Sequence, residues 1–561
     1  MTNGECCRYI RTYSELEGLQ HACTLVYCAA TTPQGVLAQL RREQGGKVRS
    51  STVLAPADSF GLNGLRGFAV AVEADVSGGL PAFSIVGLPD SAVRESADRV
   101  RAAIKNLGFR FPDRRITINL APADVRKTGT VHDLAIAAAL CMVQGWIKKS
   151  AVENAAFIGE VSLGGEIRAV RGVLPMTILA QKLGCSEIFV PADNAAEASV
   201  VSGIKVYGVP DLRTLVAHFY FKKKITPQPE YQPDFEQAAD GCDFCDIKGQ
   251  ELAKRALEVA AAGGHNALLI GPPGSGKSML AKALPSILPR MTFDEAISAT
   301  NVYSVAGEID PEHPLITSRP FRAPHHTVST AGLSGGGTIP RPGEISLAHN
   351  GVLFLDELPE FSRNALEILR QPLEDGKVTI SRAAGTVTYP SSVMLLAAMN
   401  PCPCGYYGHP TRKCTCGAKK VENYLSRISG PLLDRLDIHC EAAAVEFSDL
   451  ASKEKAEPSS AIRERVQAAR DIQNRRFAGT DITCNAKITP DMMSEVCVMT
   501  NDAKDALKTV FEAFGLSARA YDKILKVART AADLENSELI EDRHIIEAAG
   551  YRTLDRKYWA T

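Results

Sequence analysis

The sequence lacks an excess of charge of either sign, a long apolar run and any internal repeat. Lys and Arg together number 63 and Asp and Glu 64, so there is no global positive field and any nucleic-acid surface must be local. No apolar run is long enough to span a bilayer, and the N-terminus has no convincing signal-peptide core. We therefore expect a cytoplasmic protein with no membrane partner. Its 15 cysteines are then expected as free thiols or metal ligands, because the cytosol disfavours disulfides.

The 561 residues suffice for about three or four domains. Residues 1–52 show no sustained period and no clear helix caps. Residues 53–222 alternate β-prone and helical stretches and predict a first α/β domain. Residues 223–247, rich in proline and polar side chains, predict a linker. Residues 248–443 predict a second α/β domain, and residues 444–561 are helical in pattern.

The clearest motif is GPPGSGKS, which lies between an apolar strand and a helix and matches the phosphate-binding pattern G-x-x-x-x-G-K-[ST]. Its glycines let successive backbone N–H groups turn towards the phosphates of ATP. Lys277 is expected to reach the β- and γ-phosphates, and the Ser278 hydroxyl to bind Mg²⁺. An ordinary glycine-rich turn is the alternative. The predicted nucleotide-binding residues are Gly271, Pro272, Pro273, Gly274, Ser275, Gly276, Lys277 and Ser278.

Two further apolar strands end in polar side chains. Residues 352–355 precede Asp356, expected to hold the water shell of Mg²⁺, and Glu357, expected to activate the attacking water. The stretch VMLLAAMNP places Asn400 at the end of the other strand, where it would orient that water. Alone, the acidic pair would be a solvated charge pair and the asparagine a cap. After a phosphate-binding loop, the catalytic interpretation is favoured.

Four cysteines form a C-x-C-x₉-C-x-C pattern: Cys402, Cys404, Cys414 and Cys416. Such a group of soft thiolates suits structural Zn²⁺ in tetrahedral coordination. The C-x-C spacing is less diagnostic than C-x-x-C, and a loop of reduced thiols is the alternative. The adjacent His325 and His326 cannot easily share one ion, which favours a packing role in a loop.

Five long motifs carry a family resemblance: GPPGSGKS, RPFRAPHHT (319–327), LFLDELPEF (353–361), MNPCPCG (399–405) and SGPLLDRLDI (429–438). Together they resemble the YifB/ComM family of bacterial AAA+ ATPases, which are magnesium-chelatase-like or competence proteins. The match runs from about residue 53 to 555. The resemblance implies a multidomain α/β protein. It would have an N-terminal α+β domain similar to Lon protease and ribosomal protein S5 domain 2, a central AAA+ P-loop domain and a C-terminal helical lid.

The resemblance also implies roles that the residues alone do not. Arg435 matches the arginine finger, which would complete the phosphate site of a neighbouring subunit in a homo-oligomeric, hexameric ring. Arg519 matches the sensor 2 arginine of the lid. The family's inserted β-hairpin corresponds to residues 376–390, where Lys377 and Arg382 would point into a pore and contact DNA phosphates; an ordinary exposed hairpin is the alternative.

The N-terminal domain does not match the Ser–Lys dyad of Lon-type peptidases. Val131 falls at the serine position, with Thr130 one residue away, and Leu174 falls at the lysine position. A domain that binds a partner, nucleic acid or its ring neighbours is therefore expected. Because Val53 fits the family's opening, residues 1–52 are interpreted as an extension from a misassigned start codon, with a genuine disordered arm as the alternative.

Three functions follow from these features. An ATP-driven ring motor on single-stranded or branched DNA, with branch-migration or helicase activity in recombination and natural transformation, is favoured. A magnesium-chelatase-like ATPase that remodels a protein partner is the alternative, although a chelatase motor subunit would normally lack the Lon-like domain. An ATP-dependent protease is disfavoured because the dyad is missing.

Overall fold

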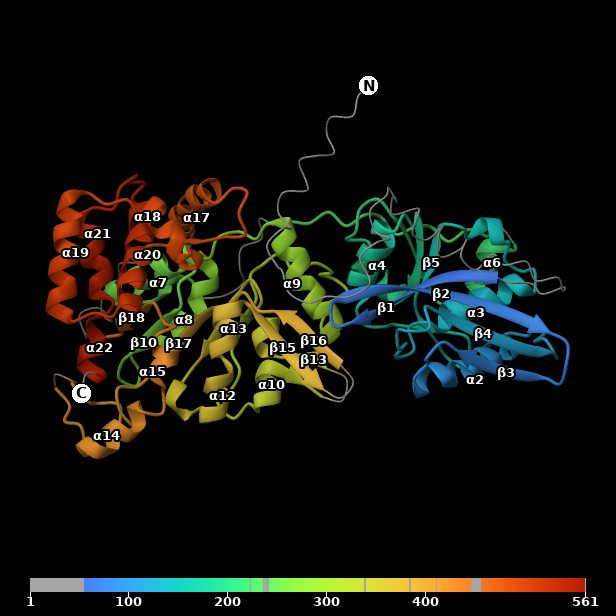
Figure 1. Ribbon diagram of the computed structural model, residues 1–561, viewed down its shortest axis with the longest axis horizontal. Coiled ribbons are helices and arrows are strands. Elements are labelled where there is room, and N and C mark those ends of the chain that lie inside the picture. Colours follow the sequence, from blue (N-terminus) through green and yellow to red (C-terminus); the bar gives the residue numbers. More distant parts are fainter. Residues whose placement is uncertain are drawn as a thin grey trace, which may run out of the picture. The chain divides into compact units, whose positions relative to one another are not determined.

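The computed structural model describes residues 55–221, 223–235, 242–337, 340–382, 385–409, 411–444 and 456–559, and Figure 1 shows their elements. The predicted extension over residues 1–52 lies outside the described residues. Within those ranges, none of the helices has both the length and the apolar character needed to cross a membrane.

Residues 55–221 contain a mixed sheet of seven strands in the order β3-β4-β2-β1-β5-β8-β9. Its β1–β2 and β2–β4 pairs are antiparallel and its other pairs are parallel. The strands are β1 (Ala55–Asn63), β2 (Arg66–Ser77), β3 (Ala82–Val86), β4 (Arg115–Ala121), β5 (Ala155–Phe157), β8 (Glu187–Pro191) and β9 (Lys205–Val209). The helices are α2 (Ser91–Asn106), α3 (Asp133–Val143), α4 (Val173–Lys182), α5 (Ala195–Ala198) and α6 (Leu212–Phe219).

The core of this sheet forms around α3, whose residues are buried from Asp133 to Met142. Such all-round burial explains an alanine-rich sequence with no polar face. By contrast, α2 is amphipathic and begins after Asp90, whose side chain accepts the Val93 N–H.

The pattern of AAFIGEVSLGGEIRAVRG (155–172) is typical of one hairpin, but the structure forms only a short antiparallel pair there. The buried β5 pairs in parallel with β1 and β8, so it belongs to the main sheet. Only β6 (Glu160–Val161) and β7 (Ile167–Arg168) form an antiparallel pair. An entirely apolar strand is more stable where both of its edges are paired.

The second sheet has five parallel strands in the order β11-β14-β17-β10-β18. They are β11 (Phe321–Arg322), β14 (Val352–Leu355), β17 (Met394–Met399), β10 (Ala267–Ile270) and β18 (Ile438–Glu441). The surrounding helices are α7 (Glu251–Gly263), α8 (Lys277–Ala283), α9 (Phe293–Ala306), α10 (Thr330–Ser334), α11 (Glu344–Leu347), α12 (Arg363–Ile368), α13 (Arg370–Asp375), α14 (Ala418–Leu425) and α15 (Gly430–Leu433). Two antiparallel pairs lie outside it, β12 (Gly335–Gly336) with β13 (Arg341–Pro342) and β15 (Lys377–Arg382) with β16 (Gly385–Pro390).

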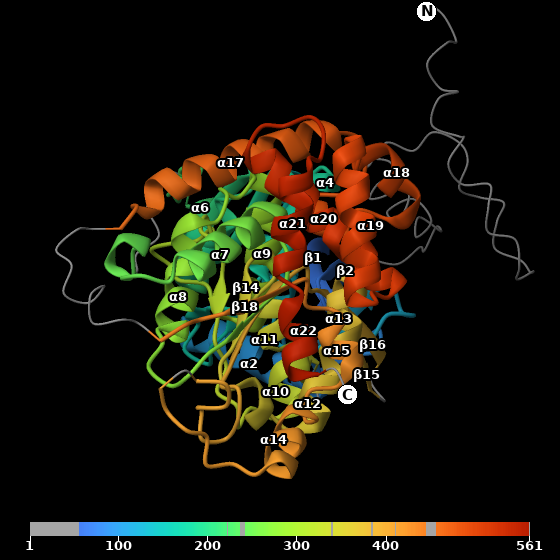
Figure 2. The ribbon, with the colours of Figure 1, turned by 90° about the vertical axis from the view of Figure 1, so that its left-hand side faces the viewer.

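The chain ends in helices, as its sequence pattern predicts. They are α17 (Ser459–Arg476), α18 (Met493–Val496), α19 (Asn501–Phe514), α20 (Ala518–Leu534), α21 (Asp542–Gly550) and α22 (Thr553–Tyr558). Helices α17 and α20 contact α7, and residues of α17, α20 and α21 share a core with β10 and β18. Figure 2 shows this helical group beside the parallel sheet. The parallel sheet and the C-terminal helices therefore share one hydrophobic core.

Candidate nucleotide-binding site

Three strands bring the predicted site residues to one edge of the parallel sheet. β17 lies between β10 and β14, with Ala398 opposite Leu269 and Leu396 opposite Phe354. All three strands are buried over their full length. Because ligands bind beyond the carboxyl ends of such strands, the phosphate-binding loop, the Asp356–Glu357 pair and Asn400 converge there.

The phosphate-binding loop needs glycine for its backbone conformation. Gly274 and Gly276 have φ values of +79° and +87°, which L side chains rarely adopt. An added Cβ would meet no heavy atom within 4 Å at either position. Conformation, rather than crowding, therefore fixes glycine here and leaves open space where phosphates would lie.

Lys277 is the cation of the loop. Its Nζ donates to the carbonyl oxygens of Gly271 (2.8 Å) and Pro272 (2.9 Å) and to Asn400 Oδ1 (3.2 Å). Burial lowers the pKa of Lys277, and the nearby carboxylates of Asp356 and Glu357 act against that shift. The structure thus brings the predicted lysine and the predicted water-orienting asparagine into contact.

The predicted Mg²⁺ ligands also meet. Ser278 Oγ donates to Asp356 Oδ2 over 2.7 Å, although 78 residues separate them in the chain. A hydroxyl and a carboxylate are the hard oxygen donors that Mg²⁺ prefers, so this pair fits a magnesium ion bridging to phosphates. The sequence predicts both residues, and the structure places them within direct contact.

Glu357 combines exposure with an unusual backbone. Its φ is +53°, a left-handed conformation that costs a non-glycine residue roughly 1–3 kcal/mol and is concentrated at functional sites. Its side chain is 55% exposed, and its Oε2 lies 3.5 Å from His326 Nδ1. A carboxylate held at the open side of the phosphate loop can accept a proton from an incoming water.

The contact with His326 was missed by the sequence analysis, which favours a loop-packing role. The signal lies in strand pairing: β11 runs parallel beside β14, with Phe321 opposite Val352. The histidine four residues after β11 therefore reaches the same edge of the sheet as the acidic pair. Because β11 has only two residues, it has no periodicity by which the sequence could reveal this pairing.

The two predicted arginines take different positions. Arg435 Nε donates to Arg370 O (2.9 Å), and its guanidinium pairs with Glu374. Arg519, in the first turn of α20 after the N-cap Ser517, is 75% exposed and lies 3.4 Å from Asp434. Within the described ranges, neither arginine forms a hydrogen bond or ion pair with the phosphate loop of its own chain.

The β15–β16 hairpin has one exposed face. Val378 and Ile380 are buried while Lys377 and Arg382 are exposed. Both cations are therefore exposed, and their placement in a pore stays a prediction. Arg382 lies at the end of β15 near Gly336, where an added Cβ would be 3.3 Å from its Nη2.

The cysteines at the end of β17 cluster. Cys402 is buried and the other three are half-buried, and all four Sγ atoms lie within 4.8 Å of one another. The cluster is compatible with zinc binding.

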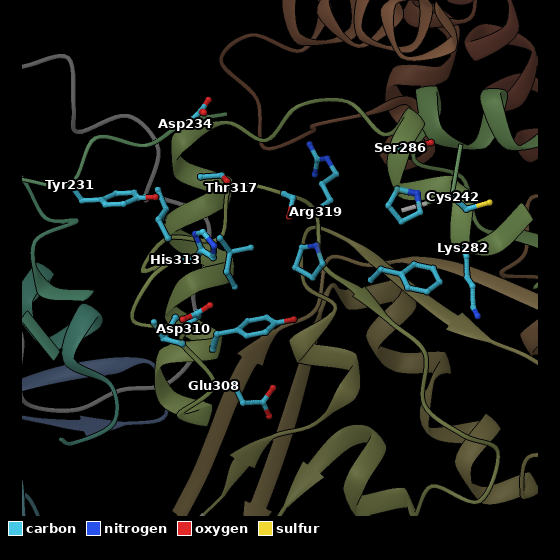
Figure 3. Close-up of a pocket in the computed structure, with 18 residues that line it drawn as sticks. Tyr231, Asp234, Cys242, Lys282, Ser286, Glu308, Asp310, His313, Thr317 and Arg319 are labelled. Atoms are coloured by element: carbon cyan, nitrogen blue, oxygen red, sulfur yellow. The ribbon is translucent and has the colours of Figure 1, made fainter. Parts of the chain in front are cut away.

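A different pocket, drawn in Figure 3, holds none of the phosphate-loop residues. Lys282 and Ser286, which follow the loop, line it together with Arg319. The guanidinium of Arg319 donates to Glu295 Oε2 and to Asn350 O, both over 2.8 Å. Those bonds connect α9 to the residue two positions before β14 and occupy the guanidinium of Arg319 within the protein.

The N-terminal sheet contains one buried Ser–His pair. Ser59 Oγ lies 2.9 Å from His132 Nδ1, and the two residues are 0% and 1% exposed. A nucleophile must reach its substrate, so this pair is structural. Thr130, next to the expected serine position, donates a hydrogen bond to Glu160 Oε2. Leu174, at the expected lysine position, is a buried leucine whose side chain cannot act as a base.

Comparison with known proteins covers most of the chain. Three family models match successive parts of the chain. The model for subunit ChlI of Mg-chelatase matches residues 72–194, the model for magnesium chelatase, subunit ChlI, matches residues 243–450, and the model for the C-terminal part of that subunit matches residues 456–552. The chain is 42% identical over 498 residues to the competence protein ComM of Haemophilus influenzae, covering 88% of this chain and 96% of that protein.

Two further relatives show how much of the chain is similar to known proteins. An uncharacterised protein YifB of Salmonella typhimurium is 42% identical over 488 residues, covering 87% of this chain and 94% of that protein. The magnesium-chelatase 67 kDa subunit of Chlorobaculum parvum is 30% identical over only 161 residues, which is 28% of this chain and 23% of that subunit. The ComM and YifB proteins match this chain over nearly their whole length, whereas the chelatase subunit matches only a part of it. The chain therefore belongs to the YifB/ComM family of magnesium-chelatase-like AAA+ ATPases.

Proposed function

We propose that this chain hydrolyses ATP as a subunit of a ring-forming motor that acts on DNA. The observation that carries the ATPase part is the convergence of Lys277, Ser278, Asp356 and Asn400, which touch one another across three strands. A lysine, a hydroxyl and a carboxylate that meet at a phosphate loop are the groups that bind the phosphates and Mg²⁺ in phosphoryl transfer.

Each residue has a defined task in the proposed reaction. The backbone of the loop and the Lys277 ammonium bind the phosphates, and Ser278 and Asp356 would hold Mg²⁺, which neutralises developing charge. Glu357 takes the proton of the attacking water and Asn400 orients that water. The exposed carboxylate of Glu357 and its contact with His326 place this base where solvent can enter.

Ring formation is supported by the contacts of the two predicted arginines, which within the described residues lie away from the phosphate loop of their own chain. Arg435 and Arg519 both belong to the motif set of the family, yet their contacts within the chain are with Arg370, Glu374 and Asp434. An arginine that completes a phosphate site in trans need not contact its own. We therefore assign Arg435 to the neighbouring subunit's site and Arg519 to the lid.

The DNA part rests on local positive charge and on one relative. Arg412, Lys413, Lys419 and Lys420 are exposed around the cysteine loop, and Lys377 is exposed on the hairpin. A chain with no net positive field needs such local groups to contact phosphates. The ComM relative is named a competence protein, and uptake and recombination of DNA are the processes in which a motor of this kind would work.

A second function is favoured by the family models, which are named for magnesium chelatase. In that case the ring would remodel a protein partner rather than move along DNA. A peptidase is not supported, since Val131 and Leu174 stand where the Ser–Lys dyad would be.

The two functions differ in what stimulates turnover. We expect ATP hydrolysis to rise with single-stranded or branched DNA and this stimulation to fall steeply between about 50 and 200 mM salt. Glu357→Gln should bind ATP and stall, whereas Lys277→Ala, the control, should bind ATP more weakly. If no single-stranded, duplex or branched DNA changes turnover of a wild-type protein that does hydrolyse ATP, the DNA assignment fails and protein remodelling becomes the better interpretation.

A further inference from the structure

The four cysteines form a cage of the size that a tetrahedral zinc ion requires. The Sγ atoms of Cys402, Cys404 and Cys414 form a triangle with sides of 3.4, 3.5 and 3.6 Å, and Cys416 Sγ lies within 4.8 Å of each. Zn–S bonds of about 2.3 Å place the sulfurs of a tetrahedral site about 3.8 Å apart. Three nearly equal separations indicate one common centre, whereas a disulfide would join a single pair at about 2.05 Å.

Main-chain N–H groups also point at the sulfurs. The Cys416 N–H donates to Cys414 Sγ over 3.4 Å, and the N–H groups of Tyr406 and Thr415 donate to Cys404. Such outer-shell hydrogen bonds hold metal ligands in orientation and stabilise thiolates. This donor set is a second observation, independent of the spacing of the sulfurs, that indicates a metal-binding loop.

The same loop touches the nucleotide site at two points. Before the first cysteine, Met399 O accepts the Gly271 N–H over 3.2 Å, and Asn400 contacts Lys277. After the second cysteine, Gly405 has φ +84°, and a Cβ there would lie 2.3 Å from Pro273 Cδ in the phosphate loop. Cys402 and Cys404 lie between these two contacts.

We propose that the four cysteines bind one Zn²⁺ ion, and that this centre holds residues 400–405 against the phosphate loop, so that metal occupancy sets ATP affinity and turnover. The zinc is then a positioning device for Asn400 and Pro273 and does not touch the reacting atoms. The proposal rests on the proposed function only in that ATP is the ligand of the phosphate loop, and DNA plays no part in it.

The first test measures metal and nucleotide on the full chain without DNA. Purified protein reconstituted with zinc should hold about one ion per chain. A zinc-selective chelator, used with Mg²⁺ in excess, should lower turnover about tenfold, and added zinc should restore it. Cys414→Ser with Cys416→Ser should lose the ion, while Cys242→Ser with Cys245→Ser, a pair outside the cluster, should keep it.

The second test separates the contact from the metal by a matched pair of glycine variants. Gly405 and Gly408 both have positive φ, +84° and +76°, but an added Cβ at Gly408 would meet only Lys557 Cε at an ordinary 3.6 Å. Both variants carry the same backbone strain, so only Gly405→Ala should push on Pro273. We expect Gly405→Ala to keep zinc and weaken binding of a fluorescent ATP analogue about ten- to hundredfold, and Gly408→Ala to bind it as wild type does.

The outcomes are decisive in either direction. A reconstituted chain that holds no zinc overturns the metal site. A chain that holds zinc but binds and hydrolyses ATP equally well after its removal overturns the coupling, as does equal ATP affinity of the two glycine variants. If the wild type has no ATPase activity, the proposed function fails, while zinc content and analogue binding still decide the metal proposal.

Discussion

Replacing Asn400 by alanine should separate ATP binding from ATP turnover. Asn400 Oδ1 accepts a hydrogen bond from Lys277 Nζ, and a bound phosphate would take its place. A hydrogen bond to a charged group contributes about 1.5–3 kcal/mol, but Lys277 keeps the carbonyls of Gly271 and Pro272 as acceptors. The net effect should therefore lie at the lower end of that range, so the release of Lys277 should raise ATP affinity by about tenfold.

Turnover should move in the opposite direction. Without its amide, the attacking water loses one of the groups that orient it, and we expect kcat of Asn400→Ala to fall about a hundredfold. Titration with a fluorescent ATP analogue measures the affinity and a phosphate-release assay the rate. Lys277→Ala is the comparison, since loss of the ammonium should weaken binding itself by at least about tenfold.

The result that would refute this reasoning is specific. If Asn400→Ala weakens ATP binding as much as Lys277→Ala does and leaves kcat unchanged, Asn400 is a binding residue and not a water-orienting one. Asn400 is only half-buried, so the melting temperature of the variant should match that of wild type. A large drop would mean that the substitution destabilises the fold and does not act on the site alone.

Two other predictions follow. Arg435→Ala and Glu357→Gln should each abolish turnover alone, but a mixture of the two should regain activity at about a quarter of the interfaces, where an intact Glu357 faces an intact Arg435; no gain on mixing would contradict action in trans. Burial lowers the pKa of His132 to about 3, below its value in the unfolded chain. The stability that this histidine contributes is therefore fully present above about pH 6.5. Below that pH the free energy of unfolding should fall by about 1.4 kcal/mol for each pH unit, because only the unfolded chain takes up the proton. Urea unfolding at pH 7.5 and 5 measures this loss, and His132→Gln should reduce it.

The sequence predicts the centre of the nucleotide site because its determinants are local. The strands β10, β14 and β17 are unbroken apolar stretches, as parallel strands buried on both faces require. Asp356 and Asn400 directly follow β14 and β17, and the phosphate loop with Lys277 follows β10, so a strand prediction also places these three residues at one edge. The contacts of Lys277 with Asn400 and of Ser278 with Asp356 follow from strand order and need no further information.

The remainder could not be predicted because it depends on pairing between distant short segments. β11 has two residues, too few for any periodicity, yet its parallel pairing with β14 is what brings His326 to Glu357. β5 reads as half of a hairpin, but its three buried residues pair with β1 and β8. Likewise, the partners of Arg435 lie about 60 residues earlier in the chain, where no local signal marks them.

The charges at the site bear on the proposal that a second subunit completes it. Lys277 contributes one positive charge to the phosphate loop, whereas Asp356 and Glu357 contribute two negative ones. Phosphoryl transfer spreads negative charge over the transferred group, and in a partly buried site an uncompensated charge is costly. Magnesium can offset part of it, but a guanidinium is the group that other ATPases add for the remainder. Arg435 and Arg519 pair with Glu374 and Asp434 within the described chain, which agrees with the proposal that a second copy supplies this charge, and the mixed-variant experiment tests that proposal directly.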